Sequence, residues 1–336
     1  MRDALVRGVW YGDGYAPLLA RAALTPLEWL YGAASLAMGA QRARCAGHSV
    51  VPTVSVGNIT VGGTGKTPLA AWVAAQLVRR GRRPALLLRG YGADESLVHE
   101  RLNPDIPVIA DPDRGAAATQ AIARGATALV LDDGFQHRQM PRDADLVLVS
   151  ADLWSDVPVR LLPAGPFREP LAALRRASLI IVTRKAASAA RAEHVAAQLR
   201  AVTGGVPMAV AYLVPDRLRE WNGSGDEAVT RLAGQRIVAV SGIGAPEAFA
   251  AQLRSLGATV DAAPFADHHA FRAADAAAIA ARAAGSDRVV CTLKDAVKLG
   301  PVWPTQAPSL WYLSQSVLLE AGAAAVYAAL DQLAAR

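Results

Sequence analysis

The sequence predicts an α/β protein with two domains, preceded by a helical segment. From residue 50 onward, short runs of β-branched and other apolar residues alternate with longer alanine-rich runs. Several of the short runs are apolar throughout, which is typical of parallel strands that helices cover on both faces. The length of 336 residues also suits about two domains.

The expected elements follow one another in two alternating series. Strands of the first series are expected at 51–56, 84–88, 106–110, 127–131, 144–149 and 178–182. A hairpin-like or linker stretch follows at 209–223. The second series has expected strands at 236–240, 258–262, 288–292 and 309–313, and helices at 246–256, 272–284 and about 316–334. We therefore divide the chain into a helical segment (1–45), a first domain (46–210) and a smaller α/β domain (211–336).

Composition excludes a disordered chain, because 52% of the residues are hydrophobic and 19% are charged. The net charge of +6 favours an anionic partner such as a nucleotide or an anionic lipid. Aromatic and basic residues do not interleave as in nucleic-acid-binding proteins, so no nucleic-acid partner is expected. Cys45 and Cys291 lie far apart, which predicts neither a structural disulfide nor a cysteine metal site.

The N-terminal stretch 17–40, PLLARAALTPLEWLYGAASLAMGA, is apolar, but its uncharged part is too short to span a bilayer core. It also lacks the order of features in a secretory signal. Two interpretations fit these residues. The stretch lies in a membrane interface, with Trp29 and Tyr31 at headgroup depth and the following arginines on anionic lipid, or it is an ordinary helix packed on the domain.

Residues 60–67, TVGGTGKT, predict a phosphate-binding loop of the P-loop type. They follow a buried strand and precede a helical run, an arrangement that points backbone amides and a helix N-terminus at phosphate. Lys66 is expected to reach the β- and γ-phosphates, and the Thr67 hydroxyl to hold Mg²⁺. Thr60 occupies a position that is usually glycine and therefore needs a backbone conformation that threonine adopts. The expected ATP-binding residues are Thr60, Val61, Gly62, Gly63, Thr64, Gly65, Lys66 and Thr67.

An acidic pair supports this interpretation. Asp132 and Asp133 directly follow an apolar strand, where a carboxylate binds Mg²⁺ directly or through water. Two classes of P-loop protein are excluded. Val61 stands where partition and ion-pump ATPases carry lysine, and TLKD (292–295) has the wrong order for a guanine-reading motif.

Three further polar stretches follow predicted strands or precede a predicted helix. They are LLLRGYGADES (86–96), LLPAGPFREP (161–170) and FADHHAF (265–271). The first two follow strands, at the edge where doubly wound sheets bind ligands. In the third, a histidine is a candidate general base, or else Asp267 caps the next helix and the histidines are solvated. Each stretch taken alone fits an ordinary polar loop.

In their order along the chain, these strings resemble the tetraacyldisaccharide 4'-kinases of lipid A biosynthesis. The matching strings are SVGNITVGGTGKTP, RGYG, DDGFQHRQMPRDADLVLV, LLPAGPFREP, FADHH and CTLKDAVK. The form TVGGTGKTP, with threonine first, is this family's own version of the phosphate loop. The chain departs from the family at ADES (93–96), which follows RGYG more closely than usual, at Ala266 and at Leu293.

The resemblance implies transfer of the γ-phosphate of ATP to the 4'-hydroxyl of a lipid A disaccharide 1-phosphate. It implies a P-loop domain, a smaller α/β domain that closes over nucleotide, and an N-terminal helix at the cytoplasmic face of the inner membrane. By motif position, Asp94 and His268 would activate the sugar hydroxyl, with Lys66 as the third catalytic residue. Glu169 would join Asp132 and Asp133 near Mg²⁺.

Two other interpretations of the same phosphate loop stay open. The chain is a soluble kinase of a small molecule, or it is a regulatory ATPase that changes conformation and has no acceptor. Labelled phosphate found on a lipid disaccharide, on another acceptor or only in water would separate the three.

Overall fold

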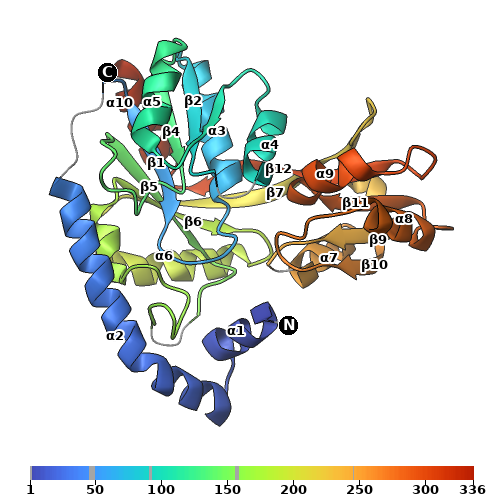
Figure 1. The fold of residues 1–336 in the computed structure, drawn as a ribbon, viewed down its shortest axis with the longest axis horizontal. Coiled ribbons are helices and arrows are strands. Elements are labelled where there is room, and N and C mark those ends of the chain that lie inside the picture. The colour runs from blue at the N-terminus through green and yellow to red at the C-terminus, as the bar shows by residue number, and fades with distance from the viewer. Residues whose placement is uncertain (1, 45–49, 91–92, 156–158, 245) are drawn as a thin grey trace. The chain divides into compact units, whose positions relative to one another are not determined.

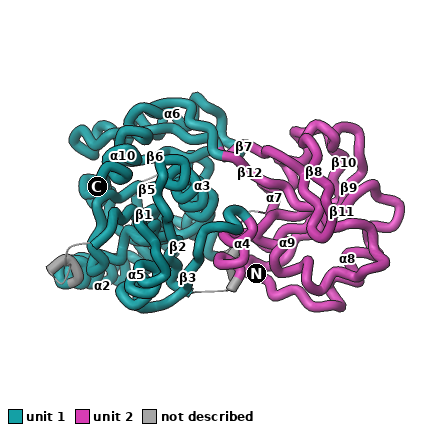
Figure 2. Tube along the Cα trace, turned by 90° about the horizontal axis from the view of Figure 1, so that it is seen from above, with its two compact units in different colours: residues 1–91, 102–212, 317–336 teal, residues 92–101, 213–316 magenta. Residues whose placement is uncertain are grey.

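The computed structural model describes residues 2–44, 50–90, 93–155, 159–244 and 246–336. The chain forms two compact units (Figure 2). Unit 1 consists of residues 1–91, 102–212 and 317–336, and unit 2 consists of residues 92–101 and 213–316. Both units are built from parallel strands and helices, so the expected α/β fold with a mostly parallel sheet is confirmed.

Unit 1 is built on a parallel sheet with the strand order β7-β6-β5-β1-β4-β2-β3 (Figure 1). Its strands are β1 Thr53–Asn58, β2 Pro84–Leu88, β3 Val108–Ala110, β4 Ala128–Asp132, β5 Ala144–Ser150, β6 Leu179–Arg184 and β7 Met208–Glu220. β1 lies between β4 and β5, so the order of the strands reverses on its two sides. Open α/β sheets bind ligands at such a switch point, beyond the carboxyl ends of the strands.

Helices cover both faces of this sheet. Successive strand residues point to opposite faces, and apolar residues on both faces pack against these helices. The helices of unit 1 are α1 Arg2–Tyr11, α2 Tyr15–Arg44, α3 Lys66–Arg79, α5 Arg114–Ala123, α6 Ala189–Thr203 and α10 Ala323–Ala335. Val54 and Val56 belong to the core under α3 and α10, whereas Leu87 packs with α5 and Val147 packs with α6. Burial on both faces explains why the strands are apolar throughout.

Unit 2 repeats this layering around the strand order β10-β9-β11-β12, in which all three pairings are parallel. Its elements are α4 Ala93–Leu102, β8 Asp226–Ala228, β9 Arg236–Ser241, α7 Pro246–Ser255, β10 Thr259–Pro264, α8 Ala273–Arg282, β11 Arg288–Thr292, α9 Leu293–Leu299 and β12 Leu310–Ala321. Val238 and Val289 pack with α8 and α9, and Ile237 packs with α7. Cys291 is a free, buried thiol in β11, and Cys45 lies outside the described residues.

The expected final helix at 316–334 is wrong over its first residues, because β12 continues to Ala321 and α10 begins at Ala323. Val317 and Leu319 pack against the core while Leu318 is exposed, which is the alternation of a strand. The stretch 209–223, expected to be hairpin-like or a linker, is mostly the single strand β7, which pairs in parallel with β6 at its start. Only residues 217–219 near its end pair with β8 in antiparallel orientation.

The compact units differ from the expected division into residues 1–45, 46–210 and 211–336. The N-terminal segment belongs to the same unit as the first domain, and two further segments change units. Residues 92–101 belong to unit 2, and residues 317–336 belong to unit 1. The second difference follows from β12, which begins in unit 2 and ends in unit 1, so that α10 completes the core against α3. The first places Asp94 in the same unit as His268.

Candidate active site

The phosphate loop connects β1 to α3 and is held in shape by buried hydrogen bonds. Thr64 is 1% exposed; its hydroxyl accepts from Asn58 Nδ2 at 2.9 Å, and its carbonyl accepts from the Thr183 hydroxyl at 2.8 Å. Gly65 precedes α3 with a φ of 89°, a left-handed conformation that suits glycine. The first amides of α3 therefore stand at a fixed place beyond β1, where a helix N-terminus attracts phosphate.

Thr60, at the position that is usually glycine, forms a β-bridge with Phe167. Positive φ angles among the described non-glycine residues occur only outside this loop, so Thr60 has the ordinary backbone that threonine requires. The amide of Val61 donates to Pro166 O at 2.8 Å. The loop 161–170 thus holds the first residues of the phosphate loop, and glycine is not needed there.

Lys66 is the first residue of α3, and both Lys66 and Arg168 form ion pairs with the carboxylate of Asp133. Its Nζ lies 3.6 Å from Asp133 Oδ1, and Arg168 Nη1 donates to both carboxylate oxygens of Asp133 at 3.0 Å. Burial alone would raise the pKa of Asp133, but the charges of Lys66 and Arg168 outweigh it and hold this pKa below its ordinary value. Asp133 is therefore ionised and fixes two cations beside the phosphate loop.

Asp132 ends β4 in register with Val56 of β1. It is 4% exposed, and its main-chain oxygen accepts from Arg114 Nη2 at 2.7 Å. Arg114 also donates to Leu87 O, so a buried guanidinium joins the ends of β2 and β4. The register explains how the acidic pair reaches the sheet edge of the phosphate loop although it lies far away in the sequence.

Glu169 is held by two side chains of unit 1. Its carboxylate oxygens accept from Gln136 Nε2 at 3.0 Å and from Arg176 Nη2 at 2.8 Å. Gln136 also donates to Asn58 O at 2.8 Å, which connects Glu169 to the end of β1. Gln136, Arg168 and Arg176 were not among the predicted site residues, although the first two stand inside the strings DDGFQH and GPFREP.

The oxygen donors of unit 1 fit a Mg²⁺ ion that is bound together with a nucleotide. Mg²⁺ takes hard oxygen ligands and keeps waters and phosphate oxygens, so one or two protein ligands suffice. Thr67 at the start of α3 and Asp132 at the end of β4 carry such oxygens beyond the carboxyl ends of β1 and β4. Asp133 and Glu169 carry them too, and each is paired with an arginine. Over the described part of the chain, no group of three acidic, histidine or cysteine side chains is placed to hold a metal ion by itself.

Unit 2 brings together Asp94 and His268, which are distant in the sequence. His268 Nδ1 lies 3.3 Å from Asp94 Oδ2, and Lys294 Nζ lies 3.0 Å from His268 Nε2. Asp94 is 5% exposed in the first turn of α4, whereas the side chain of His268 is 54% exposed. A buried carboxylate next to a solvent-facing imidazole is an arrangement suited to proton transfer.

The turn that carries His268 is shaped by its own residues. His268 has a φ of 57°, and its amide donates to Asp267 Oδ1 at 3.0 Å. Asp267 does not cap α8, because Arg272 occupies the N-cap position and is bound by Asp275. The alternative interpretation of Asp267 as a helix cap is therefore wrong. The neighbouring His269 faces Asp275 at 3.2 Å and so points to a different partner from that of His268.

The N-terminal helix α2 packs on the same loop that holds the phosphate loop. Glu28, which is buried, accepts from the amide of Leu161 at 2.7 Å and from Arg160 at 3.0 Å. Farther along α2, the Tyr31 hydroxyl donates to Arg168 O at 3.2 Å. Glu28 and Tyr31 of α2 are thus turned toward the protein.

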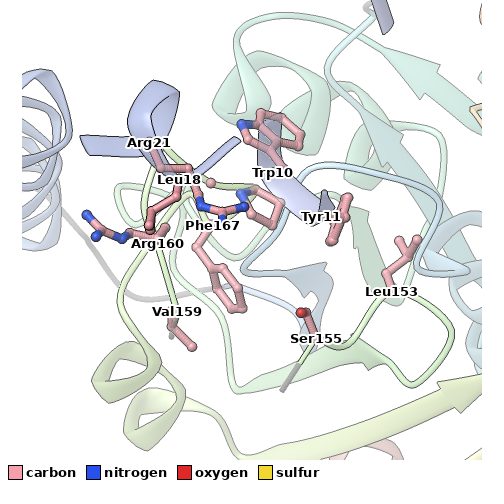
Figure 3. Close-up of a pocket in the computed structure, with 11 residues that line it drawn as sticks. Trp10, Tyr11, Leu18, Arg21, Leu153, Ser155, Val159, Arg160 and Phe167 are labelled. Atoms are coloured by element: carbon pink, nitrogen blue, oxygen red, sulfur yellow. The ribbon is translucent and has the colours of Figure 1, made fainter. Parts of the chain in front are cut away.

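A pocket of about 250 Å³ lies between α1, α2 and the loop 161–170 (Figure 3). Trp10 and Leu18 line it from the helices, and Pro166 and Phe167 line it from the loop. Because Pro166 and Phe167 also contact Val61 and Thr60, the wall of this pocket supports the phosphate loop. Its volume is below the roughly 300–1,000 Å³ of ordinary small-molecule sites.

The outward face of α2 is apolar. Large exposed side chains on it are Tyr15, Leu19, Leu27, Trp29, Leu30, Leu36 and Met38. Between residues 15 and 41 the only charged residues are Arg21 and Glu28, and neither is among the exposed ones. A surface helix of a soluble protein has the opposite pattern. No helix in the described ranges has the length and apolar character needed to cross a membrane.

Comparisons with known proteins agree on one family. The model of the tetraacyldisaccharide-1-P 4'-kinase family, LpxK, matches residues 20–335. The tetraacyldisaccharide 4'-kinase of Anaeromyxobacter sp. (strain Fw109-5) is 40% identical over 89% of this chain and 88% of its own length. That of Xanthomonas axonopodis pv. citri (strain 306) is 36% identical over 89% of both chains. The structure of LpxK from Aquifex aeolicus in complex with ATP is similar with a TM-score of 0.70 and 25% identity, over 93% of this chain and 99% of that one.

Proposed function

Because the chain belongs to the tetraacyldisaccharide-1-P 4'-kinase family, we propose that it transfers the γ-phosphate of ATP to the 4'-hydroxyl of tetraacyldisaccharide 1-phosphate, a step in lipid A biosynthesis. The structural observation that carries this proposal is the phosphate loop of unit 1, where Lys66 and Arg168 converge on Asp133. This cluster supplies fixed positive charge, which phosphoryl transfer needs most.

Residues 60–67 are the proposed ATP site. The loop amides and the start of α3 bind the phosphates, and Lys66 binds the β- and γ-phosphoryl oxygens. Asp133 keeps Lys66 in place until the greater negative charge of ATP competes for it. A Mg²⁺ ion held at this site would supply further positive charge to the phosphates. Thr67 and Asp132 are the residues we assign to hold it, with Asp133 and Glu169 as further candidates through water.

Asp94 is the proposed general base, and His268 orients it. The hydroxyl of a sugar must lose its proton as its oxygen attacks phosphorus, and a positioned carboxylate accepts this proton. Such a base contributes about 10²–10⁴-fold to the rate. The distance of 3.3 Å between His268 Nδ1 and Asp94 Oδ2 supports this assignment.

Transfer of label from [γ-³²P]ATP tests the function. The purified full chain is incubated with tetraacyldisaccharide 1-phosphate in mixed micelles, with Lys66→Ala as the matched negative control. We expect label on the 4'-position of the lipid. Label on a water-soluble acceptor would instead support a small-molecule kinase, and release of phosphate only to water would support a regulatory ATPase.

We further propose that α2 lies on the cytoplasmic face of the inner membrane. Its outward apolar face is suited to the boundary between headgroups and acyl chains, because no charged side chain interrupts it over residues 15–41. The net charge of +6 favours an anionic lipid surface. The enzyme would thereby reach its substrate while the acyl chains of that substrate stay in the bilayer.

Vesicle flotation tests this placement. The variant Leu19→Glu/Trp29→Glu/Leu30→Glu should lose binding to vesicles of phosphatidylethanolamine and phosphatidylglycerol, because three outward side chains become charged. Val202→Glu on α6 is the matched control, since it adds charge at another exposed apolar position of unit 1. Equal flotation of the triple variant and the unmodified chain would reject the membrane role of α2.

A further inference from the structure

Lys294 lies beside the Asp94–His268 pair and has no role in the mechanism above. Its Nζ lies 3.0 Å from His268 Nε2 and 3.5 Å from Asp267 Oδ1. Three ionisable groups of the described chain therefore face His268: Asp94 from α4, Asp267 from the same turn and Lys294 from α9. One of them is a cation in contact with the imidazole nitrogen that Asp94 does not face.

The contact fixes where the imidazole carries its proton. An ammonium group only donates hydrogen bonds, so Nε2 of His268 must offer its lone pair. The proton of the neutral ring then lies on Nδ1, which faces Asp94 Oδ2 at 3.3 Å. A charged His268 that donates to a neutral Lys294 is disfavoured, because lysine ordinarily holds its proton to a pH about four units higher than histidine does.

We propose that Lys294 is a positioning residue that holds Nε2 of His268 as a hydrogen-bond acceptor and so keeps the proton of the neutral ring on Nδ1, the nitrogen nearer Asp94. This inference rests on the proposed function of the pair. In the reaction, the O–H bond of the acceptor breaks and its proton passes to the carboxylate of Asp94. The acceptor oxygen forms a bond to the γ-phosphorus while the bond from phosphorus to the departing ADP oxygen breaks. His268 does not take the proton, since Lys294 occupies its free lone pair.

The backbone around Lys294 is fixed by its neighbours in α9. Thr292 caps this helix: its hydroxyl accepts from the amide of Asp295 at 3.2 Å and donates to Asp295 Oδ2 at 2.6 Å. Asp295 is fully buried. A cation in the first turn of a helix opposes the helix dipole, so stability of α9 does not explain a lysine at this position. Its contacts with His268 and Asp267, in the turn before α8, do.

Nitrogen NMR of histidine-labelled protein tests the proposal without any substrate. The His268 signals are assigned by their loss in His268→Ala. We expect the protonated nitrogen of the neutral ring in the unmodified chain to be Nδ1, because Nε2 accepts from Lys294. In Lys294→Met, where Nε2 has lost its donor, part of the neutral ring should carry the proton on Nε2 instead. Lys298→Met, one turn later on α9, is the matched control and should leave the His268 signals unchanged. Identical His268 spectra in Lys294→Met and the unmodified chain would overturn the proposal.

Kinetics separate a positioning role from direct contact with the acceptor. Lys294→Met should lower kcat about tenfold, a part of what general-base catalysis supplies, with KM for ATP unchanged. Lys294→Arg should retain most activity, because a guanidinium also donates to Nε2. In a His268→Ala background, Lys294→Met should cause no further loss. An equal loss in both backgrounds would overturn the proposal. If the NMR result is as expected but the unmodified chain does not phosphorylate the lipid acceptor, the proposed function is wrong and the role of Lys294 in orienting His268 stands.

Discussion

The phosphate site of unit 1 and the Asp94–His268 pair of unit 2 are held in different ways. In unit 1, buried hydrogen bonds on Thr64 and a loop-to-loop amide bond at Val61 fix the backbone before any charge is considered. In unit 2, an exposed histidine with positive φ is held by contacts from side chains on two helices. The first site depends on backbone position, and the second on side-chain position.

This difference follows from what each site must bind. Phosphate is recognised by amides and positive charge, which one short loop before a helix supplies. A general base must lie next to one particular hydroxyl group. The side chains that form and orient it therefore come from segments that are distant in the sequence. The two sites should therefore respond differently to substitution, and four predictions test this in decreasing order of effect.

Lys66→Ala should have the largest effect, lowering kcat about 10³-fold or more, because it removes positive charge from the transferring phosphoryl group. Steady-state kinetics with saturating ATP measure this. Lys185→Ala is the matched control: its ammonium reaches the same loop at Gly63 O but lies outside the cluster around Asp133, so its loss should be far smaller. Similar losses in both variants would show that general positive charge, rather than Lys66, matters.

Asp94→Asn should lower kcat about 10²–10⁴-fold and leave KM for ATP unchanged, because the proposed base is lost while the phosphate loop is intact. Glu100→Gln is the matched control, an exposed carboxylate on the same helix α4. A rise in KM for ATP in Asp94→Asn, with kcat preserved, would contradict the assignment of Asp94 to proton transfer.

The same contrast explains what the sequence predicted well. The phosphate loop and Asp132–Asp133 are contiguous strings beside strands, so local patterns located them and the parallel register places them at one sheet edge. Glu169 was located only through a family resemblance. Gln136 and Arg176, which hold it, were missed because their contacts depend on tertiary packing.

In unit 2, local sequence patterns predicted less of the site than they did in unit 1. Asp94 was expected in a loop and lies in α4, and Asp267 fits a helix cap by pattern but caps nothing in α8. The contact of Lys294 with His268 joins residues from two segments, which no periodicity encodes. The expected helix at 316–334 began too early because alanine-rich composition concealed the end of a long strand.

Asn58→Ala should lower the free energy of unfolding by about 1–3 kcal/mol, since the buried Thr64 hydroxyl loses its donor. It should also raise KM for ATP. Asn103→Ala is the matched control: Asn103 Nδ2 donates to Ala71 O of α3 at 3.0 Å, away from the loop, so stability should fall without an effect on ATP. Equal KM values in the two variants would show that this hydrogen bond does not shape the phosphate site.

Asp133→Asn should have the smallest effect on stability, and the effect should depend on pH. Lys66 and Arg168 hold the pKa of Asp133 below its ordinary value, so its stabilising contribution is present at neutral pH and is lost as the pH falls through the lowered pKa. The variant should be less stable than the unmodified chain at pH 7, by under about 1 kcal/mol because the carboxylate is partly exposed, and the difference should be smaller at about pH 3, below the ordinary pKa of aspartate. Urea unfolding at both pH values measures this, and a difference that grows on acidification would contradict it. Because so little stability is at stake, a loss of turnover in the folded variant would report on the position of Lys66 rather than on folding.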